Sequence, residues 1–191
     1  MCADVSVEES VLEIEIKLRA DRPEKLVDRA HALSFVCISS RTHEYNIVFD
    51  TPGQELAGRN VLLRLRRWGE NCLITLKRPA PEQENYQRFK VRRETNIIVD
   101  DFDNTVVLFS TLGFTPSFRY EKYRSAYRSP EGLLLTLDET PIGCFIELEG
   151  VPDQIDRYVV ALGYDSSDVI CQSYRSLFFS CGRSGDMLFD R

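Results

Sequence analysis

Apolar and charged residues alternate with a period of two along most of this 191-residue chain, and this pattern is the signal of β-strands. The stretch from Val11 to Arg19 is the clearest case, because four aliphatic residues alternate there with four charged ones. The same reasoning predicts seven further strands, over residues 44–50, 61–67, 72–77, 87–96, 118–128, 133–138 and 143–150. The predominance of hairpin-length connections favours an antiparallel sheet.

Helical patterns occupy the segments between or after these strands. We predict helices over residues 23–35, 101–112 and 152–162, and a shorter fourth helix over 167–179. The second and third run from acidic residues to a glycine, which are common start and stop signals of helices. The chain is long enough for a single domain with its own core, which we place over residues 1–191 with the core at about 11–179.

The charged face of the strands is ordered by sign. Residues two apart in a strand share a face, and on that face acidic residues concentrate in the first and last strands while basic residues fill the middle ones. The acids are Glu13, Glu15, Glu147 and Glu149, and the bases include Arg64, Arg66, Lys77, Lys90, Arg92, Lys122 and Arg124. The opposite face is apolar and needs to be covered by helices.

Two interpretations of this face are open. A sheet with one solvated face would also carry charges, but we would then expect the signs to be mixed. We favour an α+β fold in which eight antiparallel strands close into a barrel with a polar interior and helices packed outside. Charges in such an interior are costly unless they are paired or a ligand completes them. An anionic ligand would neutralise the bases, and Mg²⁺ or Mn²⁺ would suit the carboxylates.

Composition excludes several other classes of protein. A net charge of −6 argues against a general nucleic-acid binder, and no apolar stretch is long enough to span a membrane. We see no signal peptide and expect a cytoplasmic protein. The six cysteines are scattered without Cys-x-x-Cys spacing, so we expect reduced thiols. No motif indicates an oligomeric state.

An ordered set of motifs resembles the CYTH superfamily of triphosphate tunnel metalloenzymes. This superfamily includes class IV adenylyl cyclases, thiamine triphosphatases and inorganic triphosphatases. The motifs extend from residue 13 to 174, and Val48 stands where the family pattern has a tyrosine. In order they are Glu13-x-Glu15-x-Lys17, Phe49-Asp50-Thr51-Pro52, Leu63-Arg64-Leu65-Arg66, Thr75-Leu76-Lys77, Arg92-x-Glu94, Glu121-Lys122-Tyr123-Arg124, Asp138, Gly143 to Glu149, and Ser173-Tyr174.

The resemblance implies which residues hold substrate and metal. It implies that a triphosphate is bound by Lys17, Arg64, Arg66, Lys77, Arg92, Lys122 and Arg124, to which we add Lys90 from the same face. It implies that Mg²⁺ or Mn²⁺ is held by Glu13, Glu15, Glu147 and Glu149. We expect the catalytic residues to be Lys17, Lys77, Glu94 and Asp138.

Three functions remain open. We favour metal-dependent hydrolysis of a small-molecule triphosphate, whether inorganic triphosphate, thiamine triphosphate or a nucleoside triphosphate. A class IV adenylyl cyclase, which converts ATP to cyclic AMP and pyrophosphate, is the close alternative. A non-catalytic triphosphate or polyphosphate sensor is the third. Four aromatic residues could stack on an organic group, although strand packing is their more usual role: Tyr45, Phe49, Trp68 and Tyr86.

Overall fold

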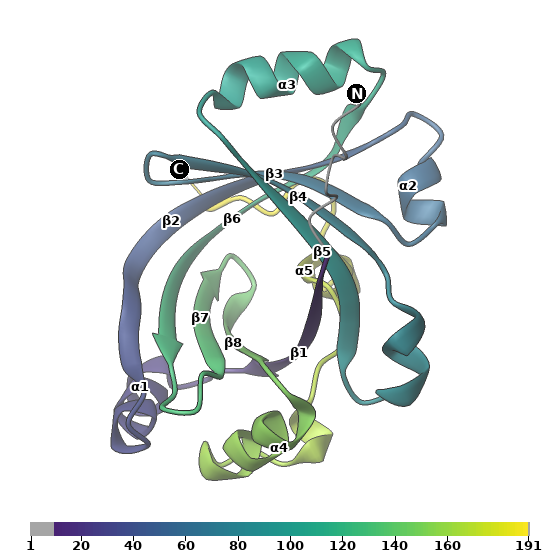
Figure 1. The fold of residues 1–191 in the computed structure, drawn as a ribbon. Helices are drawn as coiled ribbons and strands as arrows, with labels where there is room; N and C mark the ends of the chain where they lie inside the picture. The colour runs from purple at the N-terminus through teal and green to yellow at the C-terminus, as the bar shows by residue number, and fades with distance from the viewer. Residues whose placement is uncertain (1–9, 191) are drawn as a thin grey trace, which may run out of the picture.

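The computed structural model describes residues 10–190, and its eight strands form the predicted closed antiparallel barrel (Figure 1). Around the barrel the strands follow the order β1-β5-β4-β3-β2-β6-β7-β8. The strands are β1 (Val11–Arg19), β2 (Val36–Asp50), β3 (Leu62–Trp68), β4 (Asn71–Pro79), β5 (Lys90–Val99), β6 (Thr115–Arg128), β7 (Leu134–Thr140) and β8 (Gly143–Glu149). The helices are α1 (Pro23–Ala32), α2 (Glu55–Gly58), α3 (Phe102–Thr111), α4 (Pro152–Ala161) and α5 (Tyr174–Ser180), with 3-10 turns η1 (Pro81–Asn85) and η2 (Ser166–Asp168).

Strand β1 closes the barrel because it pairs with β5 on one side and with β8, the last strand of the chain, on the other. Its residues 11–15 pair with β5, and its residues 15–19 pair with β8. In the second pairing Glu15 lies opposite Glu149, and Lys17 lies opposite Glu147. Closure of the barrel therefore brings the acidic first and last strands together.

Helices α1, α3 and α4 cover the outer, apolar face of the barrel. Leu26 of α1 and Ile155 of α4 belong to a buried cluster with the β-strand residues Ile16, Ile146 and Leu148. A second cluster joins Phe102 and Phe109 of α3 to Ile47, Phe49 and Leu65. Figure 1 shows α3 on one side of the barrel and α1 and α4 on the opposite side. Each fully buried aliphatic or aromatic side chain contributes about 1.5–3 kcal/mol to this packing.

Helix α5 is the exception among the helices, because it packs against residues on the inner face. Tyr174 and Phe178 belong to a third buried cluster with Phe118, Tyr120 and Phe145. Phe118 and Tyr120 have the same parity as Lys122 in β6, and Phe145 has the parity of Glu147 in β8. The interior of the barrel is thus polar over most of its length and apolar where α5 meets β6 and β8.

Several predicted boundaries are wrong. Strand β2 begins at Val36 rather than at 44. Its first residues are mostly exposed and show no alternation of polarity, so the two-residue period did not predict them. Strand β5 begins at Lys90 rather than at 87, which leaves Arg88 outside the barrel in an exposed ion pair with Asp156. The predicted helix over 167–179 is interrupted, since Ile170 forms a β-bridge with Lys17 between η2 and α5. Helix α2 was not predicted.

The five cysteines in the described part of the chain are free thiols, as expected, and Cys2 lies outside the described residues. Both histidines are exposed: His31 lies in α1 beside the ring of Tyr127, and His43 lies in β2 beside Tyr123. No helix within residues 10–190 is both long and apolar enough to cross a membrane.

Candidate active site

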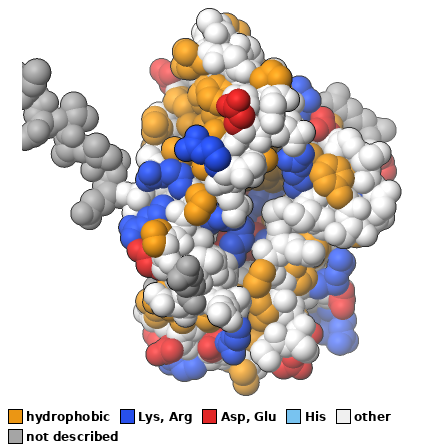
Figure 2. Space-filling view, turned by 90° about the vertical axis from the view of Figure 1, so that its right-hand side faces the viewer, with side chains coloured by type: hydrophobic (Ala, Val, Ile, Leu, Met, Phe, Trp, Pro, Cys, Tyr) orange, Lys and Arg blue, Asp and Glu red, His pale blue; other side chains and the backbone are white. Residues whose placement is uncertain are grey.

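A cavity of about 850 Å³ enters the barrel, and nine basic and six acidic residues line it. Figure 2 shows one face of the molecule hollowed near its centre, with lysine and arginine side chains inside the hollow. The lining includes Glu94 and every residue to which we assigned metal or substrate binding, but not Asp138. Strand parity therefore placed these side chains on the correct face, and the excess of basic residues suits an anionic ligand.

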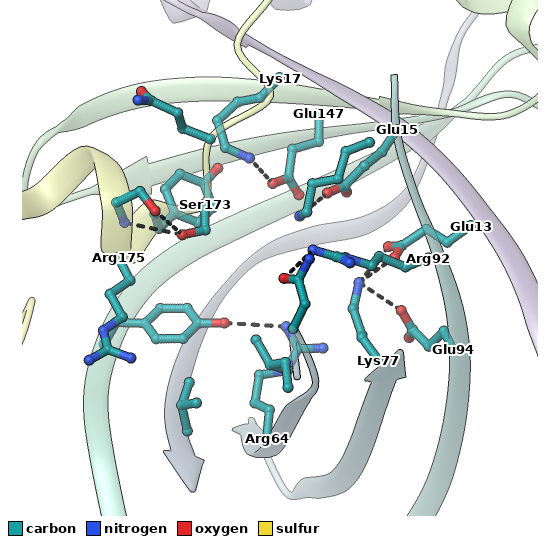
Figure 3. Close-up of a pocket in the computed structure, with 18 of the residues that line it drawn as sticks. Glu13, Glu15, Lys17, Arg64, Lys77, Arg92, Glu94, Glu147, Ser173 and Arg175 are labelled. Carbon is teal, nitrogen blue, oxygen red and sulfur yellow. Dashed lines mark hydrogen bonds and ion pairs between the residues drawn. The ribbon is translucent and has the colours of Figure 1, made fainter. Parts of the chain in front are cut away.

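Three of the four predicted metal ligands are paired with lysines. The carboxylate of Glu13 accepts a hydrogen bond from Lys77 Nζ at 2.6 Å, and Glu15 accepts one from Lys90 Nζ at 2.6 Å. Lys17 donates to Glu147, as Figure 3 shows. The carboxylates of Glu13 and Glu15 are almost inaccessible, each residue being 7% exposed. Such burial is tolerable because each charge has an opposite charge beside it.

Glu149 differs from the other three, since its carboxylate makes no hydrogen bond or ion pair with any residue in 10–190. Burial, together with the nearby carboxylates of Glu13 and Glu15, raises the pKa of Glu149 to about 7. The pKa of Glu13 is raised as well, mainly by burial. Carboxylates that repel one another in a small space are the oxygen donors that a hard divalent cation prefers.

The donor chemistry of this region therefore fits Mg²⁺ or Mn²⁺, although the described residues hold no preassembled metal cluster. Within residues 10–190, no three His, Cys, Asp or Glu side chains converge closely enough to form one. Glu13, Glu15 and Glu147 are instead each engaged by a different lysine.

Lys77 and Glu94 form a bridge beside Glu13. Lys77 Nζ lies 2.7 Å from Glu94 Oε2 as well as 2.6 Å from Glu13. Burial opposes the ionisation of Glu94, but Lys77 outweighs it and lowers the pKa of this carboxyl to about 2. A carboxylate with so low a pKa is a poor proton acceptor near neutral pH. Glu94 is therefore better placed to orient Lys77 than to accept a proton.

Asp138 lies behind two of the predicted phosphate-binding bases. It is fully buried and accepts hydrogen bonds from Lys122 Nζ at 2.8 Å, from Arg124 Nε at 2.6 Å and from the hydroxyl of Tyr174 at 2.7 Å. Burial opposes its ionisation, but Arg124 and Lys122 hold the pKa of Asp138 below its usual range. Asp138 is thus placed to fix the two bases, not to contact a ligand in the cavity.

Glu44 is a lumen residue outside the predicted site. It is 4% exposed, and its carboxylate lies 3.4 Å from Arg66, 3.5 Å from Lys122 and 4.0 Å from Arg124. These three bases outweigh the effect of burial and hold its pKa far below its usual range. The alternation of Glu44 and Asn46 with the apolar Tyr45 and Ile47 was the available signal.

Arg64 has no carboxylate within ion-pair distance among residues 10–190. It is 8% exposed, and its guanidinium donates to the Tyr120 hydroxyl at 3.2 Å and to Thr75 Oγ1 at 3.1 Å. Its Nε donates to no atom of the described chain. A buried guanidinium that is held in place but not neutralised is suited to a phosphate oxygen.

Three of the aromatic residues considered for stacking pack against other aromatic rings, although Phe49 also lines the cavity. Tyr45 contacts Phe102, Phe49 contacts Phe109, and Tyr86 contacts Phe89, with ring centroids 6.0, 5.0 and 6.4 Å apart. Trp68, at the end of β3, is absent from the cavity lining. The strand-packing alternative is therefore confirmed for Tyr45 and Phe49 of β2, whereas Tyr86 ends η1 and lies outside the strands.

Comparison with known proteins agrees with this geometry. The profile of the CYTH domain matches residues 12–158. A "putative adenylate cyclase" of Methanocaldococcus jannaschii is 25% identical over 178 residues, which cover 87% of this chain and 98% of that protein.

Solved structures share the fold. A "putative adenylate cyclase" of Vibrio parahaemolyticus superposes with a TM-score of 0.78 at 17% identity, covering 90% of this chain and 99% of that one. A "putative adenylyl cyclase" from Hippeastrum, whose structure is described as revealing a dominant triphosphatase activity, superposes with a TM-score of 0.59 at 21% identity. That alignment covers 91% of this chain and 96% of the other.

Proposed function

The chain belongs to the CYTH family, and on that premise we propose that it is a divalent-metal-dependent triphosphatase. The observation that carries the proposal is the composition of the lumen, where carboxylates at the β1–β8 seam adjoin a larger set of lysines and arginines. An anion-binding site alone would gain nothing from buried glutamates that repel its ligand. A site for a triphosphate together with a cation needs both sets.

Binding would exchange partners within the lumen. Lys17, Lys77 and Lys90 now neutralise glutamates, and in the bound state these ammonium groups would turn to phosphate oxygens. Arg64 would donate to phosphate without giving up an ion pair. Because phosphoryl transfer depends mainly on positioning and charge stabilisation, such a ring of donors supplies most of what the protein has to contribute.

The carboxylates released by this exchange would hold the metal. Glu13, Glu15, Glu147 and Glu149 are the proposed ligands. Bound Mg²⁺ or Mn²⁺ would supply Lewis-acid stabilisation of phosphate oxygens and a lowered pKa of coordinated water. The residues behind the site keep the bases oriented: Asp138 fixes Lys122 and Arg124, and Glu94 holds Lys77.

Cyclisation of ATP is the second candidate, and the printed names of two relatives favour it. The same lumen would then hold the triphosphate while the ribose 3′-hydroxyl attacked the α-phosphate and pyrophosphate left. We rank hydrolysis first because it demands no ribose 3′-hydroxyl oriented for attack on the α-phosphate. The Hippeastrum protein, with its described triphosphatase activity, is a precedent for hydrolysis in this fold.

A substrate panel tests the proposal. Tripolyphosphate, thiamine triphosphate and ATP are each incubated with the protein and Mg²⁺ or Mn²⁺, and phosphate, pyrophosphate and cyclic AMP are quantified. Release of inorganic phosphate without cyclic AMP is the expected result. Cyclic AMP with stoichiometric pyrophosphate would establish the cyclase instead, and tight binding without any product would establish a sensor.

A further inference from the structure

The cavity has a second part whose chemistry differs from that of the charged lumen. Where β2, β3 and β6 approach α2 and α5, the lining includes aliphatic and aromatic side chains together with an amide and a guanidinium. We call these residues the mouth cluster: Val48, Asn60, Val61, Leu62, Phe118 and Arg175. A bare triphosphate is polar and anionic throughout, so it would make no favourable contact with these aliphatic side chains.

The mouth cluster adjoins two of the proposed phosphate-binding bases. Val48 lies opposite Arg64 in the β2–β3 pairing and opposite Phe118 in the β2–β6 pairing. Asn60 Oδ1 accepts a hydrogen bond from Arg92 at 2.9 Å. A triphosphate held by Arg64 and Arg92 would therefore lie beside the mouth cluster.

Arg175 supplies a planar cation at this place. Its guanidinium carbon lies 5.9 Å from the ring centroid of Phe118 and 5.6 Å from that of Phe179. It makes no hydrogen bond or ion pair with any residue of the described chain. In Figure 3 it lies well apart from Glu13 and Glu94. A guanidinium that is steadied by aromatic rings and lacks a counter-ion can stack on a further planar ring.

The acidic residues that line the cavity nearby are already engaged. Asp50, at the end of β2, accepts hydrogen bonds from the backbone N–H groups of Thr51, Leu56 and Ala57. Glu94 is paired with Lys77. Positive charge from Arg92 and Arg175 thus prevails at the mouth, which disfavours a cationic ring such as a thiazolium.

We infer that the mouth cluster is a subsite for a neutral, planar ring attached to the triphosphate, with Arg175 as its specificity-determining residue. The base of a nucleoside triphosphate has this chemistry, whereas the ring that thiamine triphosphate joins to its phosphates is a cationic thiazolium. The cavity volume of about 850 Å³ leaves room for such a group, since organic ligands of drug size occupy about 300–1,000 Å³. The inference rests on the proposed triphosphate site.

Metal-free binding separates this inference from the proposed catalysis. In EDTA, calorimetry gives the Kd of the full chain for ATP, tripolyphosphate and thiamine triphosphate without turnover. Wild type is expected to bind ATP at least ten-fold more tightly than thiamine triphosphate. Equal affinities, or a preference for thiamine triphosphate, would overturn the inference. A preference for ATP without phosphate release in Mg²⁺ would support the subsite and reject the triphosphatase.

Variants identify the residues responsible. Arg175→Ala and Arg175→Lys are each expected to lower the preference for ATP over tripolyphosphate about ten-fold, equivalent to 1.4 kcal/mol, because lysine keeps the charge but loses the plane. Arg183→Ala, which removes an exposed charge outside the cavity lining, is the matched control and is expected to change neither affinity. Equal weakening of both ligands by Arg175→Ala would show a phosphate contact and overturn the ring subsite.

A second substitution avoids α5 altogether. Val61 is half-buried at the mouth, and Val61→Glu would add a negative charge there. The ratio of thiamine triphosphate affinity to ATP affinity is expected to rise at least ten-fold in this variant. An unchanged ratio would show that the ring does not reach the mouth cluster.

Discussion

Replacement of Glu149 by glutamine is expected to stabilise the metal-free protein, and to do so more strongly at pH 8 than at pH 5. Glu149 is a partly buried carboxyl without a hydrogen-bond or ion-pair partner in residues 10–190, and it faces Glu13 and Glu15. The unfolded chain ionises this group near pH 4.5, whereas the folded protein does so near pH 7. The cost of ionisation therefore grows as the pH rises through this interval, and it is complete above pH 7.

The magnitude follows from the two pKa values. The difference between 4.5 and about 7 corresponds to an upper limit of about 3 kcal/mol at pH 8. Residual solvent access to the carboxyl and the shared repulsion with Glu13 reduce this limit, so we expect a gain of about 1–2 kcal/mol. At pH 5 most of the penalty is absent, and the gain is expected to fall below about 1 kcal/mol.

Urea denaturation in EDTA at pH 5 and pH 8 measures the free energy of unfolding of wild type and variant. Glu70→Gln, in the exposed turn between β3 and β4, is the matched control and is expected to show no comparable dependence on pH. Two results would refute the reasoning: destabilisation by Glu149→Gln at pH 8, or a gain of the same size at both pH values.

Three further outcomes test the site. Arg64→Ala is expected to weaken tripolyphosphate binding by about 2 kcal/mol, or roughly thirty-fold, because a charge-assisted hydrogen bond is lost; an unchanged Kd would remove Arg64 from the site. Asp138→Asn is expected to lower the free energy of unfolding by about 3–5 kcal/mol, since Lys122 and Arg124 lose their buried counter-ion, and urea denaturation showing less than about 1 kcal/mol would contradict this. Excess EDTA is expected to abolish phosphate release and Mg²⁺ to restore it; full activity in chelator would exclude metal dependence.

Strand parity made much of the lumen predictable. In β1 and β8 the alternation is uninterrupted, so the face of Glu13, Glu15, Glu147 and Glu149 follows from the two-residue period alone. The partner of each carboxylate does not follow from it. Glu15 meets Lys90 because β1 and β5 are neighbours in the closed barrel, and that neighbourhood is a property of strand order, which local patterns do not encode.

Two lumen features have only short signals in the sequence. Glu44 lies on a strand whose inward face ends in the aliphatic Val48, so the charge pattern there is too short to stand out. The segment of α5 that contains Phe178 has an ordinary helical pattern, and only the inward-facing Phe118 and Phe145 explain why it packs inside the barrel. The aromatic residues on the inner faces of β6 and β8 were the available signal for this packing.

The pairing of β1 with β8 also bears on how the protein is made. Lys17 and Glu147 are 130 residues apart in the chain, so a growing polypeptide cannot close the seam until β8 has been synthesised. Until then the charges of β1 face water, which solvates them well, and closure has to dehydrate them in the same event that pairs them. Such long-range pairing slows folding, typically to milliseconds or seconds. A triphosphate that binds only the closed barrel would favour completion of this last step by mass action.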